Sequence, residues 1–400
     1  MVPNGWEKHP IGNICRSIVP GRNKPKVFNG DIPWVTTPEI DGKYIPSSKQ
    51  VNYISNHVAK ECGAKLVPEG AVVIAAVGDL GLTAIASEKL FLNQQLHAFV
   101  CPESVHNEYI AYFLSSQKPY MYTVASKTTI PYMNKSNCES IPILLPPLPE
   151  QQKIAKILST WDKAIATTDK LIDASQQQKK ALMQQLLTGK KRLVNPDTGK
   201  VFEGDWEEVR VANFGKVVTG NTPPKGDDSN YGSDISWATA EDFKGKYVGN
   251  TKVKLTKSGV SKARLVPKGS VLVTCIASIG KNAIADEDLT TNQQINAVIV
   301  NSKHCNEFFY YQIEFNKHKL LAWAGTTAVP ILNKSSFEKI LLLAPLKHEQ
   351  QKIASVLTAA DKEIELLETK LAHLKNEKKA LMQQLLTGKR RVKVEAMEMA

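Results

Sequence analysis

The chain has 400 residues, of which 42% are hydrophobic and 22% are charged, and its formal net charge is +12. This composition is typical of a globular protein and argues against a disordered or fibrous chain, and no apolar run approaches the ~20 residues of a membrane span. The positive charge is spread along the sequence, which is weak support for a polyanionic partner such as a nucleic acid.

The first residues and the cysteines indicate a cytoplasmic protein. Met1–Trp6 lacks the basic and then apolar layout of a signal peptide. The six cysteines form no CxxC pair, and no HExxH motif accompanies them. We therefore expect reduced, mostly buried thiols and no metal site.

Residues 1–149 are predicted to form a mixed α/β domain. Short β-type runs lie at 31–37, 71–77 and 96–100, with Gly and Pro between them, and 103–116 has the apolar spacing of a helix. The runs would form the core, and the loops between them would form the working surface.

Residues 150–190 and 349–390 contain two copies of one segment. Glu150–Ala155 and Lys179–Lys190 recur almost unchanged at Glu349–Ala354 and Lys378–Lys389, without a gap in the spacing. A repeat of this length predicts two copies of one structural unit. Residues 191–348 would then form a second domain, and 391–400 a short tail.

Each copy is predicted to be a helix of ~35–40 residues, or ~50–60 Å. Prolines precede the first copy and Gly189 follows it, as at helix starts and ends. Positions spaced by four and three residues form a continuous heptad seam in both copies, namely Ile154, Leu158, Trp161, Ile165, Thr168, Ile172, Ser175, Lys179, Leu182 and Leu186 in the first and Ile353, Leu357, Ala360, Ile364, Leu367, Leu371, Leu374, Lys378, Leu381 and Leu385 in the second.

The second domain repeats the framework of the first. Asp234–Trp237 corresponds to Asp31–Trp34, and Asn292–Gln294 corresponds to Asn93–Gln95. Trp34 and Trp237 stand at framework positions, so we expect them in the cores. The loops before the Asp-Ile-x-Trp blocks differ in length and content, which predicts one fold that presents two different surfaces.

The two seams can pair antiparallel in a register that matches every seam position. In this register Lys179 faces Ala360, and the Lys378 ammonium could lie over the ring of Trp161; the apolar pairs include Ile154 with Leu385, Leu158 with Leu381, and Leu182 with Leu357. The alternative is that each helix packs on its own domain. An antiparallel pair would make a rigid spacer and relate the domains by a pseudo-two-fold axis, which suits two separated half-sites on DNA.

These motifs resemble the specificity subunit of type I restriction-modification systems. The resemblance covers essentially the whole chain and rests on Pro146–Ala155, its copy at Ala344–Ala354, the Leu-Leu-Thr-Gly-Lys helix ends, and Thr222–Pro224 followed by Tyr231–Gly232 and Asp234–Thr239. One departure is Arg22–Asn29, which stands where the family usually has Thr-Pro and then Tyr-Gly.

The resemblance implies two α/β target-recognition domains, each reading half of an asymmetric bipartite sequence in double-stranded DNA. The two helices would space the domains and dock two methyltransferase subunits, with restriction or motor subunits joining for cleavage. This chain would bind no cofactor itself, and the other subunits would use S-adenosylmethionine, ATP and magnesium.

Candidate DNA-binding residues lie in the loops around the Asp-Ile-x-Trp blocks and ahead of each long helix. Lys and Arg suit phosphate contacts, and Arg, Asn and Thr suit base edges. The candidates are Arg22, Asn23, Lys24, Lys26, Thr36, Thr37, Lys127 and Thr128 in the first domain, and Asn221, Thr222, Lys225, Thr239, Lys244, Thr326 and Thr327 in the second.

We expect no catalysis by this chain. Asn221–Lys225 lacks the adjacent Asn or Asp and the aromatic residue of an amino-methyltransferase loop, and Gly215–Gly220 has the glycine spacing of a phosphate loop but is followed by Asn221 instead of lysine. Two alternatives remain from the sequence: the recognition region of a fused restriction-methylation enzyme, or a coiled-coil adaptor without sequence-specific DNA binding.

Overall fold

The computed structural model describes residues 2–21, 23–325 and 329–394, and it forms two compact units. Unit 1 comprises Met1–Asp169 with Thr369–Ala400, and unit 2 comprises Lys170–Glu368. Both unit boundaries fall inside the long helices, so each helix contributes residues to both cores. Across these described ranges, no helix combines the length and the apolar character needed to cross a membrane. The domain boundaries proposed from the sequence remain a prediction.

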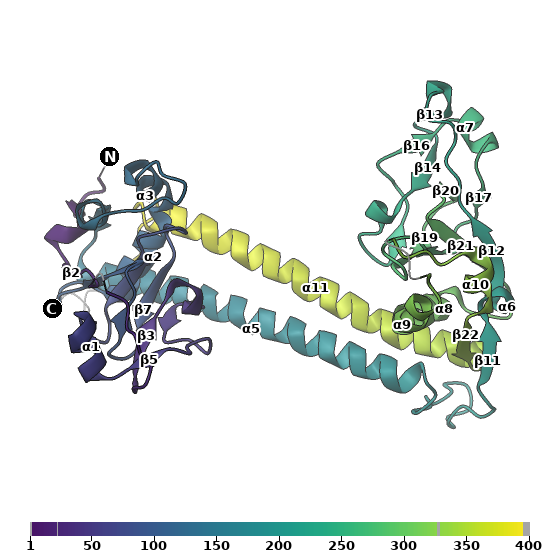
Figure 1. Ribbon diagram of the computed structural model, residues 1–400, viewed down its shortest axis with the longest axis horizontal. Coiled ribbons are helices and arrows are strands. Elements are labelled where there is room, and N and C mark those ends of the chain that lie inside the picture. The colour runs from purple at the N-terminus through teal and green to yellow at the C-terminus, as the bar shows by residue number, and fades with distance from the viewer. Residues whose placement is uncertain (1, 22, 326–328, 395–400) are drawn as a thin grey trace. The chain divides into compact units, whose positions relative to one another are not determined.

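Unit 1 is built on two sheets and a short strand pair (Figure 1). The main sheet has the order β2-β9-β6-β7-β4, with bounds Arg16–Ile18, Leu96–Val100, Val72–Ala75, Thr83–Ala86 and Tyr44–Ile45. A smaller sheet has the order β5-β3-β8, with bounds Tyr53–Ile54, Ile32–Val35 and Phe91–Leu92. The pair is β1 (Glu7–Pro10) with β10 (Pro142–Leu145).

Short helices cover these sheets and connect their strands. They are η1 (Ile11–Asn13), η2 (Thr37–Glu39), α1 (Asn56–Cys62), α2 (Asn107–Ser116), α3 (Lys118–Val124) and α4 (Lys135–Glu139). Helix α2 packs against β6 and β7 and buries Tyr109, Ile110 and Leu114 completely. This apolar face explains why the helix packs over the main sheet and covers its core.

Unit 2 repeats this architecture. Its main sheet has the order β12-β21-β18-β19-β15, with bounds Gly215–Thr219, Ile295–Val300, Val271–Thr274, Asn282–Ala285 and Tyr247–Val248. The second sheet is β13-β16-β14-β20-β17, with bounds Tyr231–Gly232, Lys254–Leu255, Ile235–Ala238, Leu289–Thr291 and Leu265–Val266. The strand pair is β11 (Glu207–Arg210) with β22 (Leu341–Ala344). The helices are α6 (Val211–Phe214), η3 (Asp228–Asn230), η4 (Ala240–Asp242), α7 (Lys257–Ser261), α8 (Asn306–Phe315), α9 (Lys317–Ala322) and α10 (Lys334–Lys339).

The predicted elements are found close to their expected bounds. The run at 96–100 is strand β9, and the runs at 31–37 and 71–77 contain β3 and β6. The helix predicted at 103–116 begins at Asn107, four residues later than expected, because His106 has extended backbone at its N-cap. Trp34 and Trp237 are buried, as predicted.

The long helices are α5 (Leu148–Leu186) and α11 (Lys347–Leu385), and each has 39 residues. The length prediction of 35–40 residues is therefore confirmed. Gly189 and Gly388 follow the helices with φ of 70° and 68°. This left-handed conformation is open to glycine and ends the helices where the sequence predicts.

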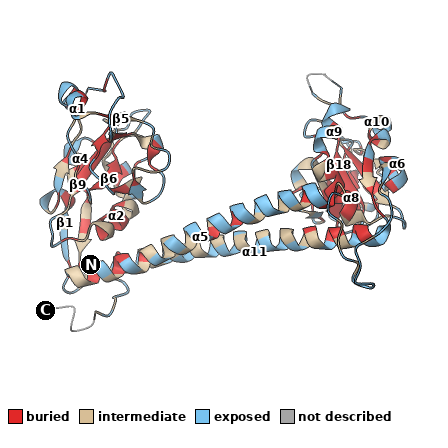
Figure 2. Ribbon diagram, turned by 90° about the horizontal axis from the view of Figure 1, so that it is seen from below, coloured by how far each residue is buried: buried red, intermediate tan, exposed pale blue. Residues whose placement is uncertain are grey.

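The heptad seam is visible in the burial pattern of the long helices (Figure 2). Every seam position of both helices is buried or half-buried. Between residues 362 and 380 of α11, every position outside the seam is exposed. Packing of one helix face produces such periodic protection in a polar helix, and the burial pattern follows the spacing of the predicted seam.

The predicted antiparallel pairing is found in each unit. In unit 1, the start of α5 and the end of α11 share one core that includes Ile154, Leu158, Leu381 and Leu385. In unit 2, the end of α5 and the start of α11 share a core that includes Leu182, Leu186, Ile353 and Leu357. Both cores also contain domain side chains, so the helices pack on each other and on the domains at once.

The predicted partner of Lys378 is wrong. Its ammonium forms an ion pair with Asp162, the residue after Trp161, and lies 5.3 Å from the ring centroid of Tyr112. Lys179 behaves in the same way: its Nζ lies 2.8 Å from Asp361, the residue after the predicted Ala360. Both lysine ammonium groups pair with a carboxylate beside the seam, because an ion pair satisfies an ammonium better than a small or aromatic side chain alone.

Acid is expected to destabilise unit 1 through His97 on strand β9. The side chain is 6% exposed, and burial lowers its pKa from 6.5 to about 4. Between these pH values His97 is protonated in the unfolded chain but not in the folded unit. The free energy of unfolding therefore falls as pH falls from 6.5 towards 4. The loss is at most about 3 kcal/mol. Hydrogen exchange of β6 and β9 from pH 7 to 4 measures it.

The variant His97→Gln is the control for this prediction. It removes the titrating group, so the dependence on pH in this window should flatten. An equally steep profile in the variant would assign the acid sensitivity to other groups, such as His106, whose pKa is also lowered by burial.

Candidate nucleic-acid interface

In unit 1, four loop segments meet at one edge of the sheets. The Asn93–Gln95 turn lies beside the end of β3, because the Asn93 amide donates to the Val35 carbonyl at 3.0 Å. The same turn joins the end of β6, since the Ala76 amide donates to the Gln95 carbonyl at 2.7 Å. The Gly78 amide then donates to the Pro131 carbonyl at 2.9 Å. We call this surface, built by 36–37, 76–78, 93–95 and 126–132, the reading edge of unit 1.

Unit 2 builds the same edge from equivalent segments. The Asn292 amide donates to the Ala238 carbonyl at 3.0 Å, and the Cys275 amide donates to the Gln294 carbonyl at 2.7 Å. The Ala277 amide completes the arrangement by donating to the Pro330 carbonyl at 3.1 Å. The reading edge of unit 2 therefore consists of 220–222, 238–239, 275–277, 292–294 and the described part of the loop before α10.

The two edges differ in the segment that supplies a threonine to the glutamine turn. In unit 1, the Thr37 hydroxyl follows β3 and donates to Gln95 Oε1 at 3.2 Å. In unit 2, the Thr222 hydroxyl comes from the loop before β14 and donates to Gln293 Oε1 at 2.5 Å. A common framework thus carries different polar loops.

Local contacts hold the loop before β14 in place. The Trp237 Nε1 atom donates to the Asn221 carbonyl at 3.1 Å, and the Asn221 side-chain amide donates to the Lys262 carbonyl at 2.6 Å. Gly220 has no space for a side chain, because a Cβ atom there would lie 2.2 Å from the Asn292 carbonyl oxygen. The loop is therefore fixed against the turn before any ligand binds.

The predicted DNA-binding residues fall into distinct groups. Exposed side chains are those of Asn23, Lys24, Lys26, Lys127, Thr128, Lys225 and Lys244. Half-buried side chains are those of Thr36, Thr37, Asn221, Thr222 and Thr239. Arg22, Thr326 and Thr327 lie outside the described residues. Contact with DNA stays a prediction for all of them.

Two of the threonines have a structural role that the sequence did not indicate. The Thr36 hydroxyl donates to Glu39 at 2.8 Å, and the Thr239 hydroxyl donates to Asp242 at 2.9 Å. Each pair forms a capping box on a short 3₁₀ helix. The same carboxylates accept from the backbone amides of Thr36 at 2.7 Å and Thr239 at 2.8 Å, so both hydroxyls already donate to a helix cap and less of each is left for a ligand.

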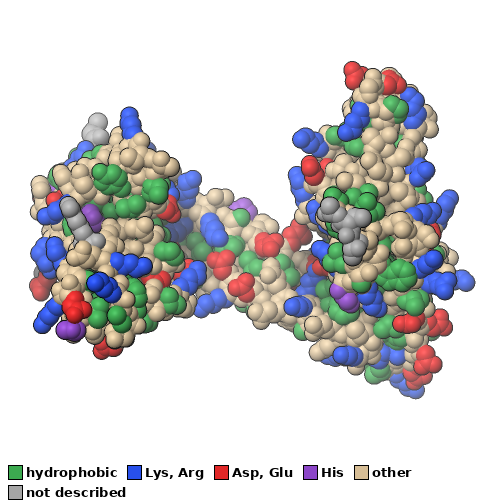
Figure 3. Space-filling view, viewed as in Figure 1, with side chains coloured by type: hydrophobic (Ala, Val, Ile, Leu, Met, Phe, Trp, Pro, Cys, Tyr) green, Lys and Arg blue, Asp and Glu red, His purple; other side chains and the backbone are tan. Residues whose placement is uncertain are grey.

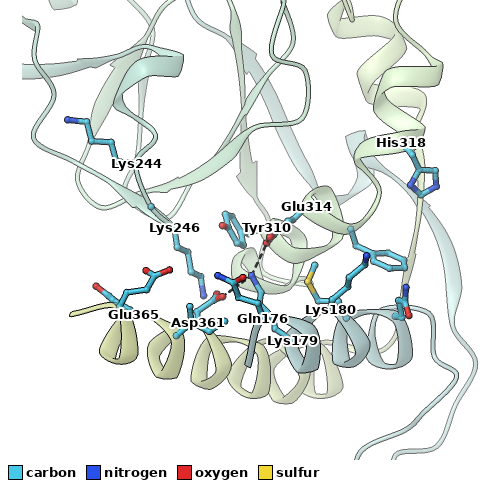
Figure 4. A pocket seen from close by; sticks show the side chains of 16 residues that line it. Gln176, Lys179, Lys180, Lys244, Lys246, Tyr310, Glu314, His318, Asp361 and Glu365 are labelled. Carbon is cyan, nitrogen blue, oxygen red and sulfur yellow. Dashed lines mark hydrogen bonds and ion pairs between the residues drawn. The ribbon is translucent and has the colours of Figure 1, made fainter. Parts of the chain in front are cut away.

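Lys244 lies apart from the reading edge. It lines a cavity of about 970 Å³ beside the α5 and α11 segments of unit 2 (Figure 4). The nearby Lys179 binds Asp361 at 2.8 Å and Glu314 at 3.3 Å, while the Tyr311 hydroxyl donates to Asp361 at 2.5 Å. Burial raises the pKa of Tyr311, so its hydroxyl stays protonated as a donor.

Unit 1 contains the equivalent network, in which the Tyr112 hydroxyl donates to Asp162 and Lys378 pairs with the same carboxylate. In both networks ammonium groups lie next to carboxylates. Such ion pairs attach a domain to the helices on which it packs. We assign them a structural role for this reason.

Lys and Arg side chains are distributed over the visible faces of both units and are not gathered in one patch (Figure 3). Within the described ranges, no group of His, Cys, Asp and Glu side chains could hold a metal ion, and the six cysteines are free thiols. The reading edges carry polar side chains that suit hydrogen bonds with a ligand, and we treat them as the candidate site for this reason.

The sequence-based list missed the glutamines Gln95, Gln293 and Gln294. The signal was present, because Asn-Gln-Gln recurs at the same position in both domains. It was interpreted as framework, which the backbone contacts confirm, but the side chains also face the edge.

Comparisons with known proteins find matches along nearly the whole chain. The family model for the type I restriction modification DNA specificity domain matches residues 3–174 and 203–376, so each match contains one domain and most of its following helix. The type I restriction enzyme MjaIX specificity subunit of Methanocaldococcus jannaschii is 23% identical over 98% of this chain and 95% of its own length.

A second relative and a solved structure extend the likeness. The putative MjaX specificity subunit of the same organism is 29% identical over 65% of this chain, and the match spans 62% of that relative's length. The crystal structure of the type I restriction-modification S subunit from M. genitalium has a TM-score of 0.60 and 13% identity, covering 96% of this chain and 98% of that chain. This last likeness supports the fold.

Proposed function

Since this chain belongs to the family of type I restriction-modification specificity subunits, we propose that it reads an asymmetric, two-part DNA sequence with one half-site per unit. The observation that carries the proposal is the duplicated reading edge. Its framework is the same in both units, while the loops that supply Thr37 and Thr222 differ. One fold with two different loop sets suits two different half-sites.

The long helices are proposed to fix the spacing between the half-sites and to position the partners. Their seam faces are covered, whereas the remaining faces of α11 between 362 and 380 are exposed. Exposed polar helix faces are available to the methyltransferase and restriction subunits of the complex. The helices would set the spacing, since each 39-residue helix is ~58 Å long and its two ends pack into the cores of unit 1 and unit 2.

Chemistry is proposed to reside in those partners. The other subunits would use S-adenosylmethionine for methylation, and ATP with magnesium for restriction. This chain would contribute recognition and positioning only.

Methylation profiling of the host genome tests the proposed function. Deleting the gene for this chain should remove one bipartite adenine-methylation motif. Replacing only the second domain should change one half of that motif and leave the other half intact. A motif that persists after deletion, or two halves that change together, would contradict the proposal.

Removing Lys225 is expected to weaken DNA binding without changing the preferred sequence. A lysine beside a phosphate releases about one counterion, so Lys225→Ala should reduce the slope of log affinity against log salt by about 1. Titrations of the full chain with its methyltransferase partner at several salt concentrations measure this. Lys60→Ala removes the same charge from an exposed position on α1 of unit 1 and should leave the slope nearly unchanged.

A further inference from the structure

We propose that the glutamines of the repeated turn, Gln95 in unit 1 and Gln293 and Gln294 in unit 2, are constant phosphate contacts that position DNA on each reading edge. The inference rests on the proposed function and adds residues that its sequence-based list does not contain. The inference divides each reading edge into the glutamine turn, which positions any DNA, and the threonine loop, which reads bases.

The first step is the orientation of the Gln95 amide. Its Oε1 atom accepts hydrogen bonds from the Thr37 hydroxyl at 3.2 Å and from Asn93 Nδ2 at 3.3 Å. Both donors come from the protein, so they fix the oxygen towards the edge. Among the described residues, the Gln95 amide nitrogen donates to no protein acceptor, and the side chain is exposed.

Unit 2 orients its glutamines in the same sense. Gln293 Oε1 accepts from the Thr222 hydroxyl at 2.5 Å, and Gln294 Oε1 accepts from Asn292 Nδ2 at 3.2 Å. In the part of the chain that the structure describes, neither amide nitrogen has a protein acceptor. Gln293 is exposed and Gln294 is half-buried.

This arrangement limits what the turn can bind. A glutamine recognises adenine with its oxygen and its nitrogen together, but here the oxygens are already engaged. Gln95 Oε1 accepts two hydrogen bonds and the other two oxygens accept one each, so the groups left free for a ligand are mainly the N–H donors. On DNA, donors alone suit an acceptor, which is either a phosphate oxygen or an acceptor on a base edge.

The repeat decides between these two acceptors. The turn has the same residues, Asn-Gln-Gln, in both units, whereas the two half-sites of an asymmetric target differ in sequence. A contact that is the same at two different sequences is best made to the backbone, which is the same at both. The threonine loops, which differ, are then left to read the bases.

The experiment compares Gln95→Glu with Gln294→Glu, the variant at the equivalent position of the unit 2 turn, in the full chain assembled with its methyltransferase partner. Glutamate keeps an acceptor for the threonine and asparagine donors, so the turn stays in place, but it loses the amide donors and adds a negative charge. Binding is measured with duplexes that carry the matched sequence, a mismatch in one half-site, or a neutral methylphosphonate at single positions beside each half-site.

We expect each variant to weaken binding to matched and mismatched duplexes by the same factor, roughly ten-fold or more, as for the loss of a hydrogen bond to a charged group. One methylphosphonate per half-site should weaken the wild-type complex to a similar extent and should largely remove the difference between wild type and variant. Asn56→Asp, at an exposed position on α1, adds the same charge outside the segments of the reading edge and should retain wild-type affinity.

Two results would overturn the inference while leaving the proposed function standing. They are unchanged affinity in both variants, and a changed ratio of matched to mismatched binding, which would make the glutamines base readers. A wild-type complex that does not distinguish the bipartite sequence from other DNA would instead overturn the proposed function, and this inference with it.

Discussion

Replacing Arg192 by methionine is expected to lower the free energy of unfolding of unit 2 by about 3–5 kcal/mol. The Arg192 guanidinium binds both oxygens of Glu349 at 2.7 Å, and the Glu349 side chain is only 2% exposed. The Arg192 Nη1 atom also donates to the Gly204 carbonyl at 2.9 Å. Without the arginine, a buried carboxylate at the start of α11 would remain unpaired.

Hydrogen exchange of α11 and β22, followed with increasing denaturant, measures the loss in unit 2 separately from unit 1. The control is the double variant Arg192→Met with Glu349→Met, which removes both charges and should recover much of the stability. If the single and double variants were equally unstable, the loss would come from packing and not from the unpaired charge.

Unit 1 contains the equivalent pair, Arg391 with Glu150, also at 2.7 Å. The Arg391 side chain is 43% exposed, compared with 23% for Arg192. Water screens the more exposed pair, so Arg391→Met should cost less than Arg192→Met.

Truncating the seam residue Leu357 to alanine is expected to destabilise unit 2 by about 2–5 kcal/mol. Leu357 is fully buried in the core shared by α5, α11 and the domain. The loss combines the missing transfer free energy with the cavity that remains. Equilibrium unfolding monitored within unit 2 measures it.

Leu366 offers a matched control on the same helix. It is 71% exposed, so Leu366→Ala should change the free energy of unfolding by no more than about 0.5 kcal/mol. Equal effects at the two positions would mean that helix propensity, and not the seam, stabilises α11.

Much of the fold could be predicted because its signals are local. The heptad spacing predicted the buried face of both long helices, and the duplicated sequence segments predicted two domains of the same fold. Gly189 predicted a helix end, which its φ of 70° confirms. These features depend on residues within a few turns of one another.

The errors concern side-chain partners that are set by contacts between residues far apart in the sequence. Periodicity places Lys378 on a helix face, but it does not show that Tyr112, from a different element, would bring its ring and hydroxyl to the same place. The contacts of the 93–95 turn were not predicted for a related reason. The contact between Thr37 and Gln95 joins residues far apart in the sequence, and only the folded sheet brings them together.

Arg391 was assigned to a short tail, yet it is bound on two sides. It pairs with Glu150 and donates to the carbonyl of Asn4 at 2.7 Å. A single basic residue after a helix carries no local signal for such a contact.

That contact has a consequence for synthesis of the chain on the ribosome. Unit 2 is one continuous segment, 170–368, whereas unit 1 needs residues from 369 onward to cover Ile154 and Leu158. The domain that is translated first is therefore completed last. Until Leu381, Leu385 and Arg391 have emerged, nascent unit 1 exposes an apolar helix face, and Glu150 has its hydrogen bond from Trp6 but no arginine partner. A stop codon before these residues should accordingly harm the first domain more than the second.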